Sequence, residues 1–168
     1  MRGAAFHVAI AGVGAAIVCA AGMSCGTAHA DWPAANEEIV IKSSDGRCLT
    51  LPGSRSNILR FLPCNQKLEQ RWIAKDGTGF STIAPITSKT ACLAVSANDA
   101  ELAALMKCKP SSPKWVFEPS GGGGRIRSDT ENLCLSRVTD PNVPNEQARI
   151  AKCEPNGGHQ LWTVDKAS

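Results

Sequence analysis

Cysteines are the residues of this chain whose type and spacing could do chemistry. Beyond residue 30 there are six of them, Cys48, Cys64, Cys92, Cys108, Cys134 and Cys153. Thiols can act as nucleophiles, bind zinc or pair as disulfides. Six cysteines in an exported chain indicate a disulfide framework, which needs an oxidising compartment. His159 is the only histidine of the same region, and with the cysteines paired it cannot make a zinc site of the usual kind.

The start of the chain predicts such a compartment. Arg2 gives a positive start, a run of mostly apolar and small residues extends over Ala4–Ala21, and Ala28-His29-Ala30 is an A-x-A cleavage pattern. We interpret residues 1–30 as a signal peptide that is cleaved after Ala30, which makes the protein secreted. Two alternatives stay open, an uncleaved membrane anchor and a lipid anchor on Cys25. No later segment is long and apolar enough to span a membrane.

The cysteines belong to an internal repeat. A Cys-Leu pair begins each copy, a second cysteine follows, and a tryptophan comes last; the tryptophans are Trp72, Trp115 and Trp162. The Cys-Leu pairs and the tryptophans recur every 42 to 47 residues, a period typical of repeat architectures. One disulfide in each copy is then the natural pairing, and we predict Cys48–Cys64, Cys92–Cys108 and Cys134–Cys153. A short N-terminal segment, 31–37, precedes a single domain, 38–168, whose copies span about residues 38–78, 79–120 and 121–165.

Short runs rich in apolar and β-branched residues predict four strands in each copy and twelve in all. The runs are Ile39–Lys42, Cys48–Leu51, Ile58–Leu62, Trp72–Ala74, Phe80–Ala84, Cys92–Val95, Glu101–Met106, Trp115–Phe117, Arg125–Arg127, Cys134–Arg137, Ala148–Ala151 and Trp162–Val164. Glu101–Met106 also fits a helix, because Ala and Leu are good helix formers. A single copy is too small to bury its own apolar face, whereas three copies can close on a shared axis. A propeller needs at least four blades, so the sequence favours an all-β fold of three units.

The order of these markers resembles the ricin-type lectin family. The family's repeat carries Cys-Leu early and Gln-x-Trp late. Gln70-Arg71-Trp72 and Gln160-Leu161-Trp162 match in full, and Pro113-Lys114-Trp115 keeps the tryptophan. The resemblance covers about residues 38–165, and it implies a β-trefoil whose motif tryptophans lie in the common core.

A narrower resemblance is to the binding subunits of cytolethal distending toxins. Val40–Ser43 followed by Gly46–Thr50 is similar to a stretch of their A subunit, and Cys92–Val95 and Asn142–Pro144 are similar to the C subunit. Those subunits are ricin-type trefoils that deliver a nuclease subunit to cells. The resemblance therefore implies a protein partner as the alternative to a glycan.

The ricin-type resemblance implies a sugar site in each repeat, and here two of its parts are missing. In the family a carboxylate two residues after the first cysteine binds hydroxyls, and an aromatic ring two residues before the second cysteine covers the sugar. The first of these positions holds Thr50, Ala94 and Ser136, and the second holds Leu62, Met106 and Ala151. The sequence therefore predicts degenerate galactose sites.

The first and third repeats keep hydrogen-bonding residues at the other site positions. The candidate ligand-binding residues are Thr50, Arg60, Glu69 and Gln70 in the first and Ser136, Arg149, His159 and Gln160 in the third, with Asp45 and Asp140 as displaced carboxylates. The third repeat is the better candidate because it has the longest loop between its cysteines, Arg137–Asn145. The alternative for each residue is ordinary solvated loop chemistry, and the two glutamines can simply bond the local backbone.

Charge and composition exclude several functions. Without residues 1–30 the net charge is about +2, with both signs interspersed, which argues against nucleic acid as a partner. No serine lies in a Gly-x-Ser-x-Gly elbow, paired cysteines leave no thiol nucleophile, and nothing places two carboxylates together. No catalytic residue, cofactor or metal is expected. The sequence predicts a secreted, non-catalytic, lectin-like module that binds carbohydrate; a protein-interaction or toxin-delivery subunit is the alternative.

Overall fold

The computed structural model describes residues 33–53, 56–77, 79–120, 123–130, 132–138 and 146–168. The expected signal peptide, its Cys25 and the candidate ligand-binding residue Asp140 lie outside the described residues. Within the described ranges, the chain has no helix that is long and apolar enough to cross a membrane.

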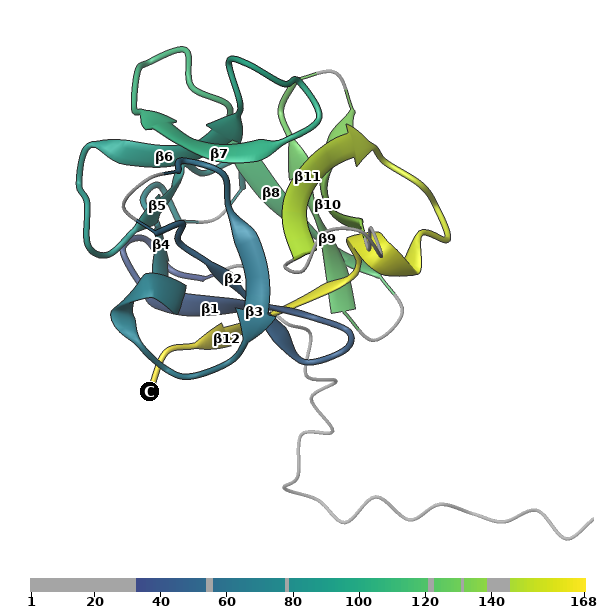
Figure 1. Ribbon diagram of the computed structural model, residues 1–168, viewed down its shortest axis with the longest axis horizontal. Helices are drawn as coiled ribbons and strands as arrows, with labels where there is room; N and C mark the ends of the chain where they lie inside the picture. The colour runs from purple at the N-terminus through teal and green to yellow at the C-terminus, as the bar shows by residue number, and fades with distance from the viewer. Residues whose placement is uncertain (1–32, 54–55, 78, 121–122, 131, 139–145) are drawn as a thin grey trace, which may run out of the picture.

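Twelve β-strands make up the described chain, and each falls on one of the runs predicted from the sequence (Figure 1). The strands are β1 (Glu38–Ser43), β2 (Arg47–Thr50), β3 (Arg60–Pro63), β4 (Trp72–Ala74), β5 (Ile83–Pro85), β6 (Ala91–Val95), β7 (Ala103–Lys107), β8 (Trp115–Ser120), β9 (Gly123–Ser128), β10 (Leu133–Val138), β11 (Glu146–Lys152) and β12 (Trp162–Lys166). Two short 3-10 helices, η1 (Leu68–Gln70) and η2 (Gly158–Gln160), precede β4 and β12. The all-β class is confirmed, including a strand at β7, where the sequence also fitted a helix.

Six of the strands form the wall of a closed barrel. β1 pairs with both β12 and β4, β4 with β5, β8 with β9, and β9 with β12, all antiparallel. Between β5 and β8 the wall closes through a bridge, in which Ser81 and Trp115 exchange two main-chain N–H···O bonds of 2.7 Å. Closure removes the free sheet edges that would otherwise invite pairing with other chains.

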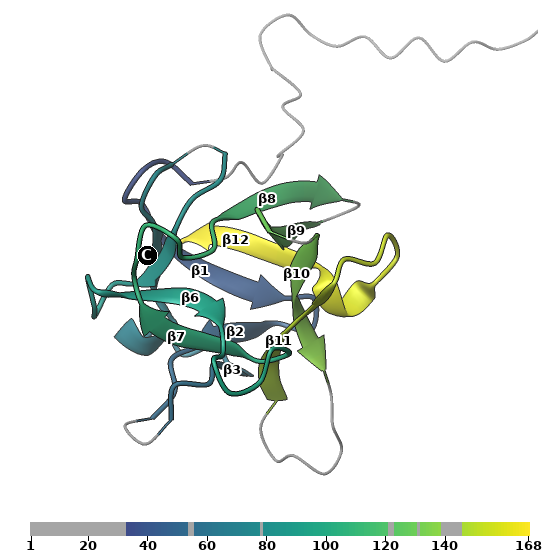
Figure 2. The same ribbon diagram turned by 90° about the horizontal axis from the view of Figure 1, so that it is seen from above.

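The other six strands form three hairpins, β2–β3, β6–β7 and β10–β11, which lie together on one side of the wall strands in Figure 2. Main-chain bonds join the hairpins in a triangle. The Leu59 N–H donates to the Ala103 carbonyl (3.0 Å), the Ala148 N–H to the Leu59 carbonyl (2.9 Å), and the Ile150 N–H to the Glu101 carbonyl (2.8 Å). Each sequence repeat thus contributes one hairpin and two wall strands, which is the predicted β-trefoil.

The three motif tryptophans tie each unit together in the same way. All three side chains are buried. Each indole Nε1 donates to the main-chain carbonyl of the leucine in the Cys-Leu pair of its own unit: Trp72 to Leu49 (2.9 Å), Trp115 to Leu93 (3.1 Å) and Trp162 to Leu135 (3.1 Å). A buried indole needs such an acceptor, because its N–H has left water. The spacing of Cys-Leu and Trp in the sequence is the signature of this contact.

The three disulfides are the predicted ones. Cys48–Cys64, Cys92–Cys108 and Cys134–Cys153 have Cα–Cα distances of 5.0, 5.2 and 5.0 Å, which lie in the usual range. In each unit the first cysteine is buried on the first strand of the hairpin, and the second follows the hairpin's second strand. Each bond therefore fastens the hairpin to the loop that leads to the next wall strand.

Three strands start later than the sequence predicted, β3 and β7 by two residues and β5 by three. The run Phe80–Ala84 yields β5 only from Ile83 onward. The chain turns before it, because Gly79 has a φ of +85°, which L side chains rarely adopt. The Ser81 Oγ then accepts a hydrogen bond of 2.9 Å from the main-chain N–H of Asp76, which holds the turn.

Replacing Trp72 or Trp162 with alanine is expected to lower the free energy of unfolding by about 3–5 kcal/mol, the usual cost of truncating a buried aromatic ring. Each change also leaves a leucine carbonyl without its indole donor. Denaturant melts of the oxidised protein measure the loss. Leu68→Ala is the control, because that side chain is 56% exposed and its truncation should cost less than about 0.5 kcal/mol. A loss below about 1 kcal/mol at both tryptophans would contradict their place in the core.

Peptide mapping without reduction is expected to recover three disulfide-linked peptide pairs, each from a single unit. The reason is that each cysteine lies opposite a partner of its own hairpin. Recovery of any pair that joins two different units would refute this arrangement.

Candidate functional site

The outer faces of two hairpins bring sequence-predicted site residues together. In the first unit Thr50 on β2 lies directly opposite Arg60 on β3. In the third unit Ser136 on β10 lies directly opposite Arg149 on β11. Directly opposed residues of an antiparallel pair project to the same face, so each hydroxyl residue shares a face with an arginine.

The 3-10 helices add the remaining members of each set. η1 carries Glu69 and Gln70, and the main-chain N–H of Leu51 donates to the Glu69 carbonyl at 2.8 Å, which anchors η1 beside β2. η2 carries His159 and Gln160 and packs against β10. The structure therefore brings together the described members of both predicted sets, except Asp45; Asp140 lies outside the described residues.

Gln70 acts inside the fold, because its side chain is fully buried. Its Oε1 accepts from the Asn65 N–H at 2.7 Å. Its Nε2 donates to the Pro63 carbonyl at 3.0 Å and to the Thr50 Oγ1 at 2.9 Å. The amide thus joins the residue before the second cysteine to the residue after it, and so fixes the loop that leads to the motif tryptophan.

The third and second units fix the same loop by two different means. Gln160 is also fully buried; its Oε1 accepts from the Glu154 N–H (2.8 Å) and its Nε2 donates to the Lys152 carbonyl (2.9 Å). The second unit has no glutamine here. Instead, the Ser112 Oγ accepts from the Lys109 N–H at 2.8 Å, the N–H that follows the second cysteine.

The two hydroxyl side chains also lie beneath the surface. Thr50 is 3% exposed, and its Oγ1 donates to the Cys48 carbonyl at 2.8 Å while accepting from Gln70. Ser136 has no exposed surface, and its Oγ has no hydrogen-bond partner within the described part of the chain. The site residues on these two hairpins that reach solvent are therefore the arginines.

The first unit presents three half-buried side chains at its candidate site. They are Arg60 and Leu62, which alternate with a buried residue on β3, and Glu69 on η1. They offer a guanidinium, an aliphatic surface and a carboxylate. In the second unit Ala94 lies opposite Ala104, so the equivalent face has no polar group.

The basic side chains of the third unit's candidate site lie close to carboxylates of the protein. Arg149 Nη1 lies 2.9 Å from the Oε2 of Glu101, a residue of the second unit whose side chain is 74% exposed. His159 Nε2 lies 3.7 Å from Glu154 Oε2, which is an ion pair only when the imidazole is protonated. A ligand that binds Arg149 through an acidic group must compete with Glu101.

Asp45 lies on the β1–β2 turn but faces the third unit. Its carboxylate pairs with Arg137 on β10, accepts a hydrogen bond from the Ser43 hydroxyl, and lies 3.6 Å from the Arg47 Nε. Burial alone would raise the pKa of the Asp45 carboxyl, but the bonds from Ser43 and Arg137 outweigh it and hold the pKa below its ordinary value. Asp45 thus joins two units, a role that its grouping with the first repeat did not predict.

Three residues of these networks were absent from the sequence-based set. Ser112 stands at the position of Glu69 and His159 relative to the motif tryptophan, so its place in the repeat could have marked it. Glu101 and Arg137 come from other units than their partners, and nothing in the repeat pattern points to them.

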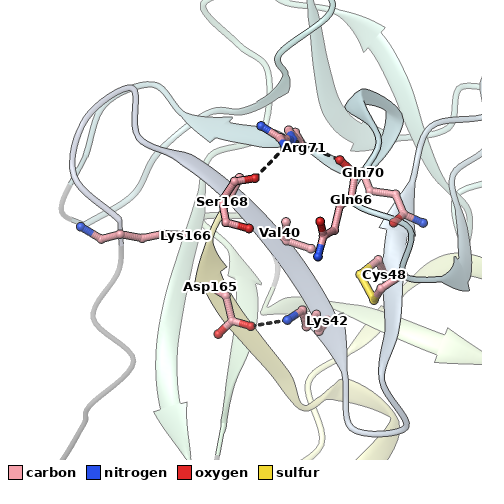
Figure 3. Close-up of a pocket in the computed structure, with 11 residues that line it drawn as sticks. Val40, Lys42, Cys48, Gln66, Gln70, Arg71, Asp165, Lys166 and Ser168 are labelled. Carbon is pink, nitrogen blue, oxygen red and sulfur yellow. Dashed lines mark hydrogen bonds and ion pairs between the residues drawn. A yellow bond between two sulfur atoms is a disulfide. The ribbon is translucent and has the colours of Figure 1, made fainter.

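A pocket beside η1 is lined by parts of β1, η1 and Asp165–Ser168 (Figure 3). Lys42 Nζ lies 2.6 Å from Asp165 Oδ2 across it, and the Arg71 Nη2 donates to the Ser168 main-chain oxygen at 2.7 Å. Lys42 and Asp165 pair within the pocket, whereas its Lys166 and Arg71 pair with carboxylates outside it, those of Glu37 and Glu38. None of the three half-buried side chains of the first unit's candidate site lines it.

Gln70→Ala is expected to lower the free energy of unfolding by at least about 2 kcal/mol. It leaves the Asn65 N–H and the Pro63 carbonyl without their partner, and each buried group left unsatisfied costs about 1–3 kcal/mol. Lys67→Ala, on an exposed neighbour, is the control. Chemical denaturation of both variants decides the point, and equal midpoints would mean that Gln70 does not hold the loop.

Solved structures share this fold at low sequence identity. A mosquitocidal holotoxin superposes with a TM-score of 0.67 at 15% identity over 79% of this chain, which spans 17% of that chain. A Macrolepiota procera ricin B-like lectin in complex with lactose superposes with 0.64 at 17% identity over 79% of this chain and 97% of that chain. The cytolethal distending toxin from Actinobacillus actinomycetemcomitans superposes with 0.61 at 16% identity over 78% of this chain and 92% of the matched chain.

Curated protein sequences contain no close relative of this chain. A family model, the ricin-type beta-trefoil lectin domain, matches residues 35–162, which is most of the sequence. The match begins just before β1 and ends at the third motif tryptophan, so it includes all three units. The chain therefore belongs to the ricin-type β-trefoil lectin domain family.

Proposed function

We propose that this protein is a secreted, non-catalytic carbohydrate-binding module that uses its first and third units. The observation that carries the proposal is the pair of outer hairpin faces where polar side chains project from β3 and η1 and from β11 and η2. The family match supports a glycan ligand. A lectin that this chain spans over 97% of its length forms a complex with lactose, which supports a sugar ligand for a trefoil of this size.

The sites are proposed to be degenerate toward galactose. A galactose site needs a carboxylate to hold hydroxyls and an aromatic ring to cover the apolar face of the sugar. Thr50 and Ser136 replace the carboxylate and are buried, and Leu62 and Ala151 replace the ring. The remaining polar groups favour a ligand of different chemistry.

Export and the lack of catalysis belong to the same proposal. Residues 1–30 are expected to direct export and to be cleaved after Ala30, which suits a chain held by three disulfides. Within the described residues, no three His, Cys, Asp or Glu side chains are placed to hold a metal ion. Near the third unit's candidate site, Glu101 pairs with Arg149 and Glu154 lies 3.7 Å from His159.

A protein-interaction or toxin-delivery subunit is the second candidate. Its support is the match to nearly the whole of one chain of the cytolethal distending toxin. A nuclease-like gene beside this one, and co-purification of the two products, would favour this candidate over a free-standing lectin.

Galactose and lactose are expected to bind with dissociation constants above about 1 mM. Losing the carboxylate removes charge-assisted hydrogen bonds worth about 1.5–3 kcal/mol, and a millimolar sugar site has only about 4 kcal/mol in total. Isothermal titration of the oxidised mature protein measures both sugars. A constant below about 1 mM for either one would overturn the assignment of degenerate galactose sites.

A glycan array probed with the same protein is expected to identify at least one ligand. Binding of that ligand should fall when residues of the first unit (Arg60, Glu69) or of the third (Asp140, Arg149, His159) are replaced by alanine. Lys107→Ala is the matched control, because Lys107 is an exposed charge on the second unit's hairpin. An array without any ligand would reject carbohydrate binding.

A further inference from the structure

Arg60 differs from the other described arginines because its guanidinium bonds no oxygen of the described residues. The structure describes seven arginines, and six of them bond or pair with an oxygen of the protein through the guanidinium. These are Arg47, Arg71, Arg125, Arg127, Arg137 and Arg149. Arg60 makes no such contact with any residue in the described ranges. A half-buried guanidinium with five N–H donors and no acceptor among the described residues is a site that an external anion can satisfy.

The surroundings of Arg60 define what kind of anion fits. Leu62 lies two residues along the same face of β3 and offers an aliphatic surface. Glu69 projects from η1, which is anchored beside β2 by the bond from the Leu51 N–H to the Glu69 carbonyl. The Thr50 hydroxyl turns inward to Gln70 and Cys48, so on this face of the hairpin Arg60 and Leu62 are the side chains that reach solvent.

We propose that the first unit binds a glycan that carries a carboxylate group, and that Arg60 holds this group. This inference rests on the proposed carbohydrate-binding function and names its ligand class. The planar guanidinium matches a carboxylate with two parallel hydrogen bonds, which favours this group over a neutral hydroxyl. Glu69 accepts hydrogen bonds from sugar hydroxyls, and Leu62 contacts the carbon-bound hydrogens of the ring. The negative charge of Glu69 disfavours densely sulfated or phosphorylated polymers.

The other two units do not offer the same binding site. Arg149 of the third unit is already paired with Glu101 at 2.9 Å, so a ligand carboxylate would have to displace a carboxylate of the protein. The second unit has Ala94 and Ala104 at the opposed positions and no cation there. The expected stoichiometry for carboxylated glycans is therefore one site per chain.

Titrations with matched neutral and acidic probes test the proposal. Lactose is the neutral probe, 6'-sialyllactose carries the same disaccharide with a sialic acid carboxylate, and digalacturonic acid supplies a uronic acid carboxylate. At least one acidic probe is expected to bind about tenfold or more tightly than lactose, as charge-assisted hydrogen bonds of about 1.5–3 kcal/mol require. Which of the two does so identifies the source of the carboxylate.

Variants locate the site. Arg60→Ala is expected to abolish the preference for the acidic probe, and Arg60→Lys to keep only part of it, because lysine has the charge without the planar fork. Lys107→Ala removes an exposed charge from the second unit's hairpin and should leave binding within about twofold. Arg149→Ala tests the third unit separately. Far-UV circular dichroism and denaturant melts confirm that each variant is folded.

Three outcomes would overturn the inference, and they are distinguishable from one another. Equal binding of lactose and both acidic probes, unchanged in Arg60→Ala, rejects the carboxylate while carbohydrate binding stands. A preference for an acidic probe that is lost in Arg149→Ala but kept in Arg60→Ala rejects the first unit as its location. The absence of binding to any glycan on an array rejects carbohydrate binding itself, and this inference with it.

Discussion

The bond from a tryptophan indole to a leucine carbonyl is the contact on which each unit depends. It lies in the dry interior, where an unpaired N–H or carbonyl costs about 1–3 kcal/mol, so the two groups specify each other's position. Its acceptor is on the first strand of a hairpin and its donor opens a wall strand, so the bond fixes how the hairpin sits on the barrel. Trp162 also stacks on Phe61 of the first unit at a centroid distance of 4.8 Å, and so links the last repeat to the first.

The polar residues around each hairpin form two layers, an inner layer that stabilises the fold and an outer layer that faces solvent. The inner layer, represented by Gln70, Gln160 and the hydroxyl of Ser112, holds the loop after the second cysteine by hydrogen bonds to main-chain groups. The outer layer, represented by Arg60 and Arg149, faces solvent. The glutamine of a Gln-x-Trp motif in this chain therefore reports on folding, and only the outer layer reports on what the domain binds.

The sequence predicted the fold well because its decisive features are local and repeated. The Cys-Leu pairs, the second cysteines and the tryptophans each recur in the same order, and this order predicts the three disulfides. The short apolar and β-branched runs between turn residues predict the twelve strands. The site was predicted less completely. Asp45 pairs with Arg137 two repeats away, and Arg149 pairs with Glu101 of the preceding unit. The closure of the trefoil brings such partners together, so the spacing of residues along the chain does not predict these ion pairs. The inward turn of Thr50 likewise depends on the buried amide of Gln70, which only the folded loop places beside it.

The closure of the wall at Ser81 and Trp115 gives the barrel a seam. The neighbouring pairs of wall strands that flank it, β4–β5 and β8–β9, are joined by ladders of three and six residue pairs, whereas the seam rests on one bridge. The junction between β9 and β12 is as narrow, because it rests on the single pair of Trp162 and Gly124. Local opening follows the path where the fewest main-chain bonds must break, so fluctuations of the native state are expected at these two junctions rather than between β1 and β12, which share five pairs. The second unit, whose hairpin has no polar face toward a ligand, therefore lies beside one of the two narrowest junctions of the barrel.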